Sequence, residues 1–154
     1  MKNSVLSSIT ISVFGVFVIL TNSVFCIGQT TMLADCLSYE PSVVALEVKL
    51  TRKTFPGPPN YASVRKGDTP ETYWLLSLEH LVCVDEDRAS EHVNNAQKEI
   101  RLVQLVVDPQ ISNPHAGLIG KRVVTTGTLF GGINGPHHTP VLLTVTTLRE
   151  RLGP

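Results

Sequence analysis

The chain lacks an excess of charge of either sign. Its 154 residues carry 13 basic and 13 acidic side chains, so the formal net charge is zero at neutral pH. A protein that binds nucleic acid or an anionic membrane through its general electrostatic field usually carries a clear basic excess. The balanced charge therefore argues against nucleic acid as a partner.

The sequence also lacks the short motifs of common catalytic sites. It has no Gly-x-Ser-x-Gly nucleophile motif, no glycine-rich phosphate loop and no dinucleotide fingerprint. Carboxylates are present, but their spacing along the chain does not show that two of them flank one bond, as glycoside hydrolysis requires. We therefore expect a protein that is not an enzyme and uses no cofactor.

Long apolar runs are absent except at the N-terminus. Lys2 is followed by an uncharged, mostly apolar stretch from Val5 to Leu20, which is typical of a secretory signal peptide. The stretch is shorter than the ~20 apolar residues of a spanning helix. We expect residues 1–28 to be a signal peptide with an undetermined cleavage point, so that no span remains after cleavage. An uncleaved signal that anchors the protein is the alternative.

Cysteine is scarce, with three in the whole chain. Cleavage after Gly28 leaves Cys36 and Cys83, and an even count in an oxidising compartment predicts a disulfide. A cysteine nucleophile or a metal thiolate is the alternative, although no neighbouring CxxC motif or paired histidine supports it. Cys26 complicates the count if it is retained, for example as a lipid attachment site.

The remaining residues, 29–154, predict a single, mainly β domain. Apolar and polar residues alternate along residues 42–50 and 72–81, as they do in half-buried strands, and residues 122–130 are rich in valine and threonine, which favour strands. The third stretch changes phase between Leu102 and Val103, which indicates a bulge or burial on both faces. Trp74 shares its face with leucines, so we expect it in the core. The five predicted strands are residues 42–50, 72–81, 99–107, 122–130 and 141–148.

A short helix is predicted between the third and fourth strands, over residues 112–120. Asn113 followed by Pro114 is typical of an N-cap and the first helical position, and Gly120 suits the left-handed residue that ends a helix. Residues 51–70 are rich in proline and glycine, so they predict a long, stiff connection between the first two strands.

The order of these elements predicts a fold. Three strands, a short helix and two further strands is the order of the oligonucleotide/oligosaccharide-binding (OB) barrel, a small five-stranded Greek-key barrel. The segment 118–123, which leads into residues 126–129, looks like the joint between the helix and the fourth strand of such barrels. Another small, partly open β-barrel is the alternative.

Several unusual strings are spread along the chain: Cys36-Leu37, Glu40-Pro41, the segment 55–79, Cys83-Val84, the segment 104–106 and the segment 127–145. Together they resemble an exported bacterial family known as domain of unknown function 4431. The resemblance implies an exported, periplasmic domain with a Cys36–Cys83 pair, and it implies no activity. The chain has Pro136 where the family tends to carry a further histidine, which weakens a metal site built on that loop.

Two adjacent histidines, His137 and His138, form the first candidate site. Imidazole binds zinc and copper, but adjacent residues of an extended segment point to opposite sides. One metal ion would therefore need more ligands from elsewhere in the fold, such as His80, His92 or His115. Without a metal, we expect the pair to hold the loop before the last strand or to contact a ligand directly.

The second candidate is the segment Phe55–Tyr61, in which two aromatic residues flank prolines and can stack on a sugar, a base or a peptide. In an OB barrel, this connection and the connection between strands four and five flank the binding face. Phe55–Tyr61 and Gly131–Thr139 should then lie on one side of the barrel. We expect an exported binding or accessory domain that recognises an envelope protein or a small ligand there. The binding residues expected are Phe55, Tyr61, His137, His138 and Thr139; the alternative function is zinc or copper binding by His137 and His138.

Overall fold

The computed structural model describes residues 36–89 and 94–153, which belong to a compact unit formed by residues 34–154. The expected signal peptide, Cys26 and His92 lie outside the described residues. Within the described residues, no helix has the length and hydropathy needed to cross a membrane.

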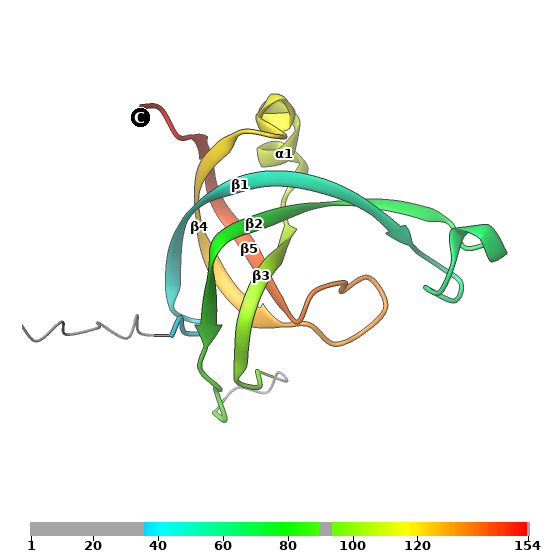
Figure 1. The fold of residues 1–154 in the computed structure, drawn as a ribbon, viewed down its shortest axis with the longest axis horizontal. Helices are drawn as coiled ribbons and strands as arrows, with labels where there is room; N and C mark the ends of the chain where they lie inside the picture. Colours follow the sequence, from blue (N-terminus) through cyan, green and yellow to red (C-terminus); the bar gives the residue numbers. More distant parts are fainter. Residues whose placement is uncertain (1–35, 90–93, 154) are drawn as a thin grey trace, which may run out of the picture. The chain divides into compact units, whose positions relative to one another are not determined.

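Five strands form a closed barrel (Figure 1). Its strand order is β1-β2-β3-β5-β4; β3 and β5 are parallel, and the other neighbouring strands are antiparallel. This arrangement confirms the predicted mainly β, OB-like barrel with a helix between β3 and β4. The elements are β1 (Val43–Pro56), the 3-10 helix η1 (Val64–Lys66), β2 (Pro70–Val84), β3 (Gln97–Val106), α1 (Pro109–His115), the 3-10 helix η2 (Ala116–Leu118), β4 (Arg122–Gly131) and β5 (Val141–Glu150).

The barrel core follows the alternation of the sequence. Every second residue of β1 from Val44 to Leu50 is buried, whereas the residues between them are exposed. Leu50 and Leu76 are fully buried, and full burial of one such side chain stabilises a fold by about 1.5–3 kcal/mol. Trp74 is half-buried and packs against the edge of this core, not in its centre.

The phase change in the third strand reflects burial on both faces. Val103, Gln104 and Leu105 are buried in succession, so β3 is covered on both faces. The register between β2 and β3 shifts between Ser77 and Val82, but the extra residues belong to β2. The pairing of β3 runs without interruption from Leu102 to Gln104, so no bulge lies at the phase change itself.

The connection predicted over residues 51–70 is wrong in extent. Residues 51–56 continue β1 and pair with residues 70–75 of β2, ending at Pro56 opposite Pro70. The threonines of this stretch favour a strand, and both prolines fall at strand ends, where a missing N–H is tolerated. We call this paired extension the β1–β2 arm; it runs away from the barrel in Figure 1, and residues 57–69 form its tip.

The start of the helix is also corrected. Helix α1 begins at Pro109, and Asp108 is its N-cap, whose side chain accepts a hydrogen bond from the Gln110 amide at 2.7 Å. The pair Asp108-Pro109 carries the same capping signal as Asn113-Pro114 but lies directly after β3. Pro114 instead falls inside α1. Gly120 has a φ of 90°, as its predicted left-handed position requires.

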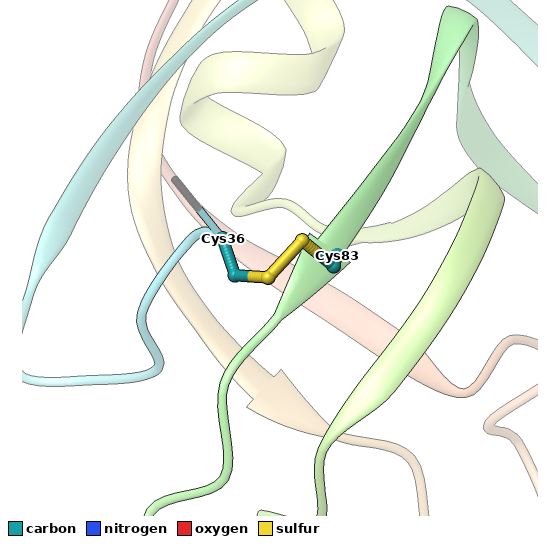
Figure 2. Close-up of a disulfide and its surroundings, with 2 residues drawn as sticks. All are labelled: Cys36 and Cys83. Carbon is teal, nitrogen blue, oxygen red and sulfur yellow. A yellow bond between two sulfur atoms is a disulfide. The ribbon is translucent and has the colours of Figure 1, made fainter. Parts of the chain in front are cut away.

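A disulfide joins Cys36 to Cys83, as predicted (Figure 2). The Leu37 amide donates to the Cys83 carbonyl at 2.8 Å, and the Asp85 amide donates to the Leu37 carbonyl at 2.9 Å. The residues before β1 are thereby fastened to the end of β2. The bond spans 47 residues, and a loop of this length corresponds to about 4 kcal/mol of stabilisation in the chain-entropy model.

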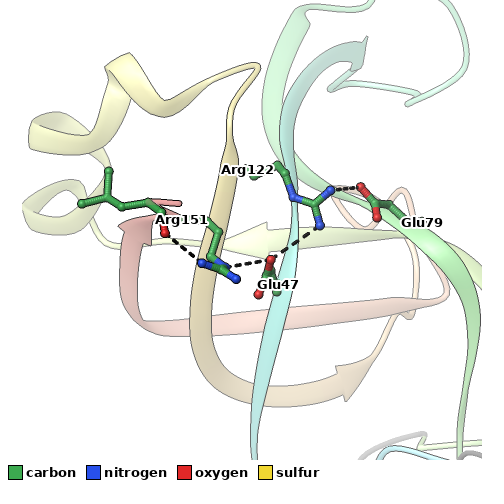
Figure 3. Close-up of polar contacts among 5 residues, drawn as sticks. Glu47, Glu79, Arg122 and Arg151 are labelled. Atoms are coloured by element: carbon green, nitrogen blue, oxygen red, sulfur yellow. Dashed lines mark hydrogen bonds and ion pairs between the residues drawn. The ribbon is translucent and has the colours of Figure 1, made fainter. Parts of the chain in front are cut away.

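Exposed charges on the barrel wall pair with one another (Figure 3). Arg122 of β4 contacts Glu79 of β2 and Glu47 of β1, and Arg151 Nε lies 2.9 Å from a Glu47 oxygen. The hydrogen bond from Arg151 holds the pKa of Glu47 below its ordinary value. Because exposed ion pairs contribute little to stability, this group mainly neutralises its part of the surface.

Candidate functional site

The two candidate segments meet in a stack of aromatic rings. Phe55 lies near the end of β1, and His138 lies in the β4–β5 connection, residues 132–140. Their ring centroids are 4.1 Å apart and their planes differ by 1°. The Tyr73 ring of β2 is tilted against both, at 6.4 Å from Phe55 and 5.2 Å from His138. We call these three residues the ring clip, because they fasten the β1–β2 arm to the β4–β5 connection.

Phe55 contacts two neighbours through its ring. His138 is stacked parallel to the ring. The Lys53 ammonium lies over the ring at 4.9 Å from its centroid. A cation over an aromatic face is attracted by the ring's negative quadrupole. Phe55 therefore joins the β1–β2 arm to the β4–β5 connection through its ring.

The surroundings of the ring clip favour the uncharged forms of Tyr73 and His138. The Tyr73 hydroxyl donates to a Glu71 oxygen at 2.6 Å, and burial together with this carboxylate raises the pKa of Tyr73 to about 12. Burial also lowers the pKa of His138, since the imidazolium loses hydration, although the negative charge of Glu71 opposes the shift. The His138 Nε2 atom is buried and has no hydrogen-bond partner among the described residues.

Gln104 holds the β4–β5 connection from the other side. The residue is only 2% exposed. Its side chain donates to the Pro136 carbonyl at 2.7 Å and accepts from the His138 amide at 2.8 Å. Its own amide donates to the Thr139 hydroxyl at 3.0 Å, and that hydroxyl donates to the Val141 carbonyl at 2.7 Å. Thr139 is thus buried and links β3 to the start of β5 through its hydroxyl. Gln104 was missed from the sequence, where its signal is a lone amide within an apolar run.

The ends of the β4–β5 connection are also pinned together. The Gly132 amide donates to the Pro140 carbonyl at 2.8 Å. A Cβ atom at Gly132 would lie 2.2 Å from the Thr139 carbonyl oxygen, so this close approach requires glycine. The connection is therefore a defined loop with a fixed base.

His137 has surroundings different from those of His138. Its ring meets the edge of Phe130, with centroids 5.7 Å apart, and its Nδ1 accepts from the Ile133 amide at 3.2 Å. Among the residues that the structure describes, no three His, Cys, Asp or Glu side chains gather as metal ligands would. Metal binding by this pair stays a prediction.

Tyr61 lies at the arm tip, beside the β4–β5 connection. A Cβ atom at Gly135 would be 3.8 Å from its ring. The tip is organised by Asp68, a residue 4% exposed, whose carboxylate accepts from the amides of Asn60, Ala62 and Ser63 at 3.0, 2.8 and 2.7 Å. These backbone hydrogen bonds lower the pKa of Asp68. Tyr61 is therefore an exposed ring on a preformed tip.

A cleft of about 420 Å³ opens next to the ring clip, between β2, the end of β3, α1 and the β4–β5 connection. Its size is in the range of ligand sites. No lysine, arginine, aspartate or glutamate is among the described residues that line it. We call it the β2–β3 cleft; its lining residues are Thr72, Tyr73, Trp74, Gln104, Leu105, Val106, Val107, Ser112, Pro136 and His137.

Only one side of this cleft was predicted from the sequence. His137 lines it, and Phe55, His138 and Thr139 hold its rim in place. Tyr73, Trp74 and Ser112 were not foreseen as site residues, because their proximity depends on β2, β3 and α1 coming together in three dimensions. No local pattern in the sequence indicates that these three elements lie together.

The fold and the cleft define a small OB-like barrel domain with a candidate binding site beside its β4–β5 connection. The family described as Domain of unknown function (DUF4431) matches residues 102–149, which confirms the resemblance noted from the sequence. The matched part contains Gln104 and the whole β4–β5 connection. No curated protein and no solved structure matches the chain.

Proposed function

We propose that the protein is an exported, non-enzymatic binding domain that recognises an envelope protein or a small ligand at the β2–β3 cleft. The observation that carries the proposal concerns the β4–β5 connection. It is held in two ways, by stacking within the ring clip and by hydrogen bonds to Gln104, and it borders a cleft whose described lining carries no charged side chain. Preorganised walls reduce the ordering cost of binding. Of the two candidate segments, Gly131–Thr139 contributes Pro136 and His137 to the lining, and Phe55–Tyr61 joins this connection through the stacking of Phe55 on His138.

Export is supported by two independent features. The described domain contains a disulfide, and such bonds persist in oxidising compartments. The N-terminal residues have the composition of a signal peptide. We place the protein in the bacterial periplasm, because the family that it resembles is exported in bacteria.

The proposal is tested by blocking the cleft without unfolding the barrel. Val106 lines the cleft and is 43% exposed, so Val106→Arg places a long side chain in the opening at little cost to the core. Leu102 lies on the same strand, is 39% exposed and is not among the residues that line the cleft. Leu102→Arg is therefore the matched control.

The purified wild type and both variants are immobilised and exposed to an envelope extract, and retained material is quantified by mass spectrometry. A thermal-shift series with sugars, peptides and nucleotides runs beside it, since a ligand of the folded state adds about 2.7 kcal/mol at a hundredfold excess over its Kd. We expect at least one partner that wild type and Leu102→Arg retain and Val106→Arg loses. Equal retention by all three proteins would contradict the proposal.

A further inference from the structure

We infer that the occupant of the β2–β3 cleft is an uncharged, extended peptide segment that adds as a strand along the edge of β2. The inference rests on the proposed function of the cleft as a binding site and names the class of its ligand. Addition of a strand to a sheet edge is an established mode of peptide recognition, in which main-chain hydrogen bonds supply affinity and side-chain pockets supply specificity.

The edge of β2 at the cleft is a preformed template. Pairing between β2 and β3 begins at Leu75 opposite Gln104, while β2 continues back to Pro70. The stretch Thr72–Trp74 lines the cleft and is held extended by β1 on its other edge. Alternate residues of a strand direct their N–H and C=O groups to opposite edges. At least one of these three residues therefore presents both groups toward the cleft.

The opposite wall is also a strand. Leu105 and Val106 of β3 line the cleft and pair with Leu143 and Thr144 of β5 on their far edge. The cleft is thus the gap between β2 and β3. It opens where β2 is no longer paired with β3 and belongs to the β1–β2 arm. A chain in extended conformation matches such a gap, because its side chains alternate between the two faces of the sheet.

The residues that line the β2–β3 cleft favour an uncharged peptide segment. The described residues around the cleft include no lysine, arginine, aspartate or glutamate. The nearest carboxylate of β2, Glu71, is engaged by the Tyr73 hydroxyl at 2.6 Å. Exposed strand edges in proteins usually carry charges or proline that prevent pairing, and Thr72–Trp74 carries neither. A charged side chain entering here would lose hydration without gaining an ion pair.

Other ligand classes fit the cleft less well. A saccharide or a base needs free aromatic faces on which to stack, yet Phe55 is stacked on His138 with the Lys53 ammonium over its ring, and Tyr73 is packed against Phe55 and His138. Trp74 is half-buried against the core. A nucleic-acid backbone would also need basic groups that the described lining does not supply.

The test uses a random dodecamer peptide library displayed on phage, selected on the purified protein with Val106→Arg as the counter-selection target. Enriched sequences are synthesised with a fluorescent label, and Kd is measured by anisotropy for wild type, Val106→Arg and Leu102→Arg. We expect uncharged peptides rich in β-branched residues, bound at least about tenfold more weakly by Val106→Arg and equally well by Leu102→Arg. A tenfold change in Kd corresponds to about 1.4 kcal/mol.

Strand addition has its own signature in the peptide. Each backbone nitrogen of the peptide is methylated in turn, which removes one N–H donor. We expect alternate methylations to weaken binding about tenfold and the intervening ones to be tolerated, because alternate amides face the β2 edge. Hydrogen exchange at the amides of residues 72–74 should also slow in the complex.

The inference is overturned if no selected peptide depends on Val106, if methylation has the same effect at every position, or if a saccharide or nucleotide is the ligand that Val106→Arg loses. In each of these cases the proposed function still holds if Val106→Arg loses a partner that wild type captures from the envelope extract. Both fail together where neither capture nor peptide binding distinguishes Val106→Arg from Leu102→Arg.

Discussion

Gln104 is the residue on which the β4–β5 connection depends most. It is the partner of two main-chain groups of the connection, the Pro136 carbonyl and the His138 amide. Gln104→Leu keeps the volume but leaves both groups without this partner, so we expect a loss of about 1–3 kcal/mol in the free energy of unfolding. Urea denaturation measures it. Gln110→Leu, on exposed α1, is the control, and an equal effect of both substitutions would contradict the assigned role.

His138 gives the domain a pH-dependent stability. Its pKa in the fold lies below the ordinary value of 6.5, because burial disfavours the charged imidazole. Between the two pKa values the unfolded chain binds a proton that the folded chain does not, so stability falls as the pH drops through 6.5 toward the folded pKa. His138→Phe keeps a ring against Phe55 but cannot titrate.

This dependence is measured by urea unfolding of wild type and His138→Phe between pH 5 and pH 8. We expect the difference in unfolding free energy, wild type minus variant, to decrease as the pH is lowered. Parallel curves, or a difference that grows at low pH, would show that His138 is not held in its neutral form by the fold.

At the scale of elements, the ring clip couples the β1–β2 arm to the β4–β5 connection. Phe55→Ala removes the ring that His138 stacks on, and aromatic pairs contribute about 0.5–1.5 kcal/mol beyond their buried area. We expect hydrogen exchange of amides 133–138 to accelerate, with the barrel strands unaffected. Val64→Ala, at an exposed position of the arm tip, should leave exchange in the connection unchanged. Unchanged exchange in Phe55→Ala would show that the clip does not restrain the loop.

The strand centres could be predicted from the sequence, whereas several ends could not. Alternation located the first two strands because each has a core face, and the valine and threonine content indicated the fourth. The β1–β2 arm was missed because its residues 51–56 face no core, so alternation gives no signal there, and Pro56 suggested a loop. The helix start was misplaced because Asp108-Pro109 and Asn113-Pro114 carry the same capping signal.

The candidate site was predictable only in part, for a related reason. His138 and Phe55 stood out in two segments that the fold does bring together, although Phe55 lies in β1 and not in a connection. Their direct stacking, which covers Phe55, depends on the angle at which the arm leaves the barrel. The cleft itself depends on where β2 and β3 stop pairing. Contacts between segments that are far apart in the chain do not appear as a periodic pattern in the sequence.

At the scale of the whole molecule, the Cys36–Cys83 disulfide is the main covalent restraint on the described domain. We expect the native protein to show no alkylatable thiol at these positions and to gain two hydrogens on reduction, as seen by intact mass. Reduction should lower the free energy of unfolding by about 4 kcal/mol, from the loop-closure entropy returned to the unfolded chain. Two reactive thiols in the unreduced native protein would contradict the bond.

The central claim is that this OB-like barrel binds a partner at the β2–β3 cleft. The most direct measurement is the side-by-side capture from envelope extract by wild type, Val106→Arg and Leu102→Arg, because both substitutions add the same charge to similarly exposed positions of β3. The account predicts a partner retained by wild type and Leu102→Arg and lost by Val106→Arg. Retention that does not distinguish the two variants would contradict it.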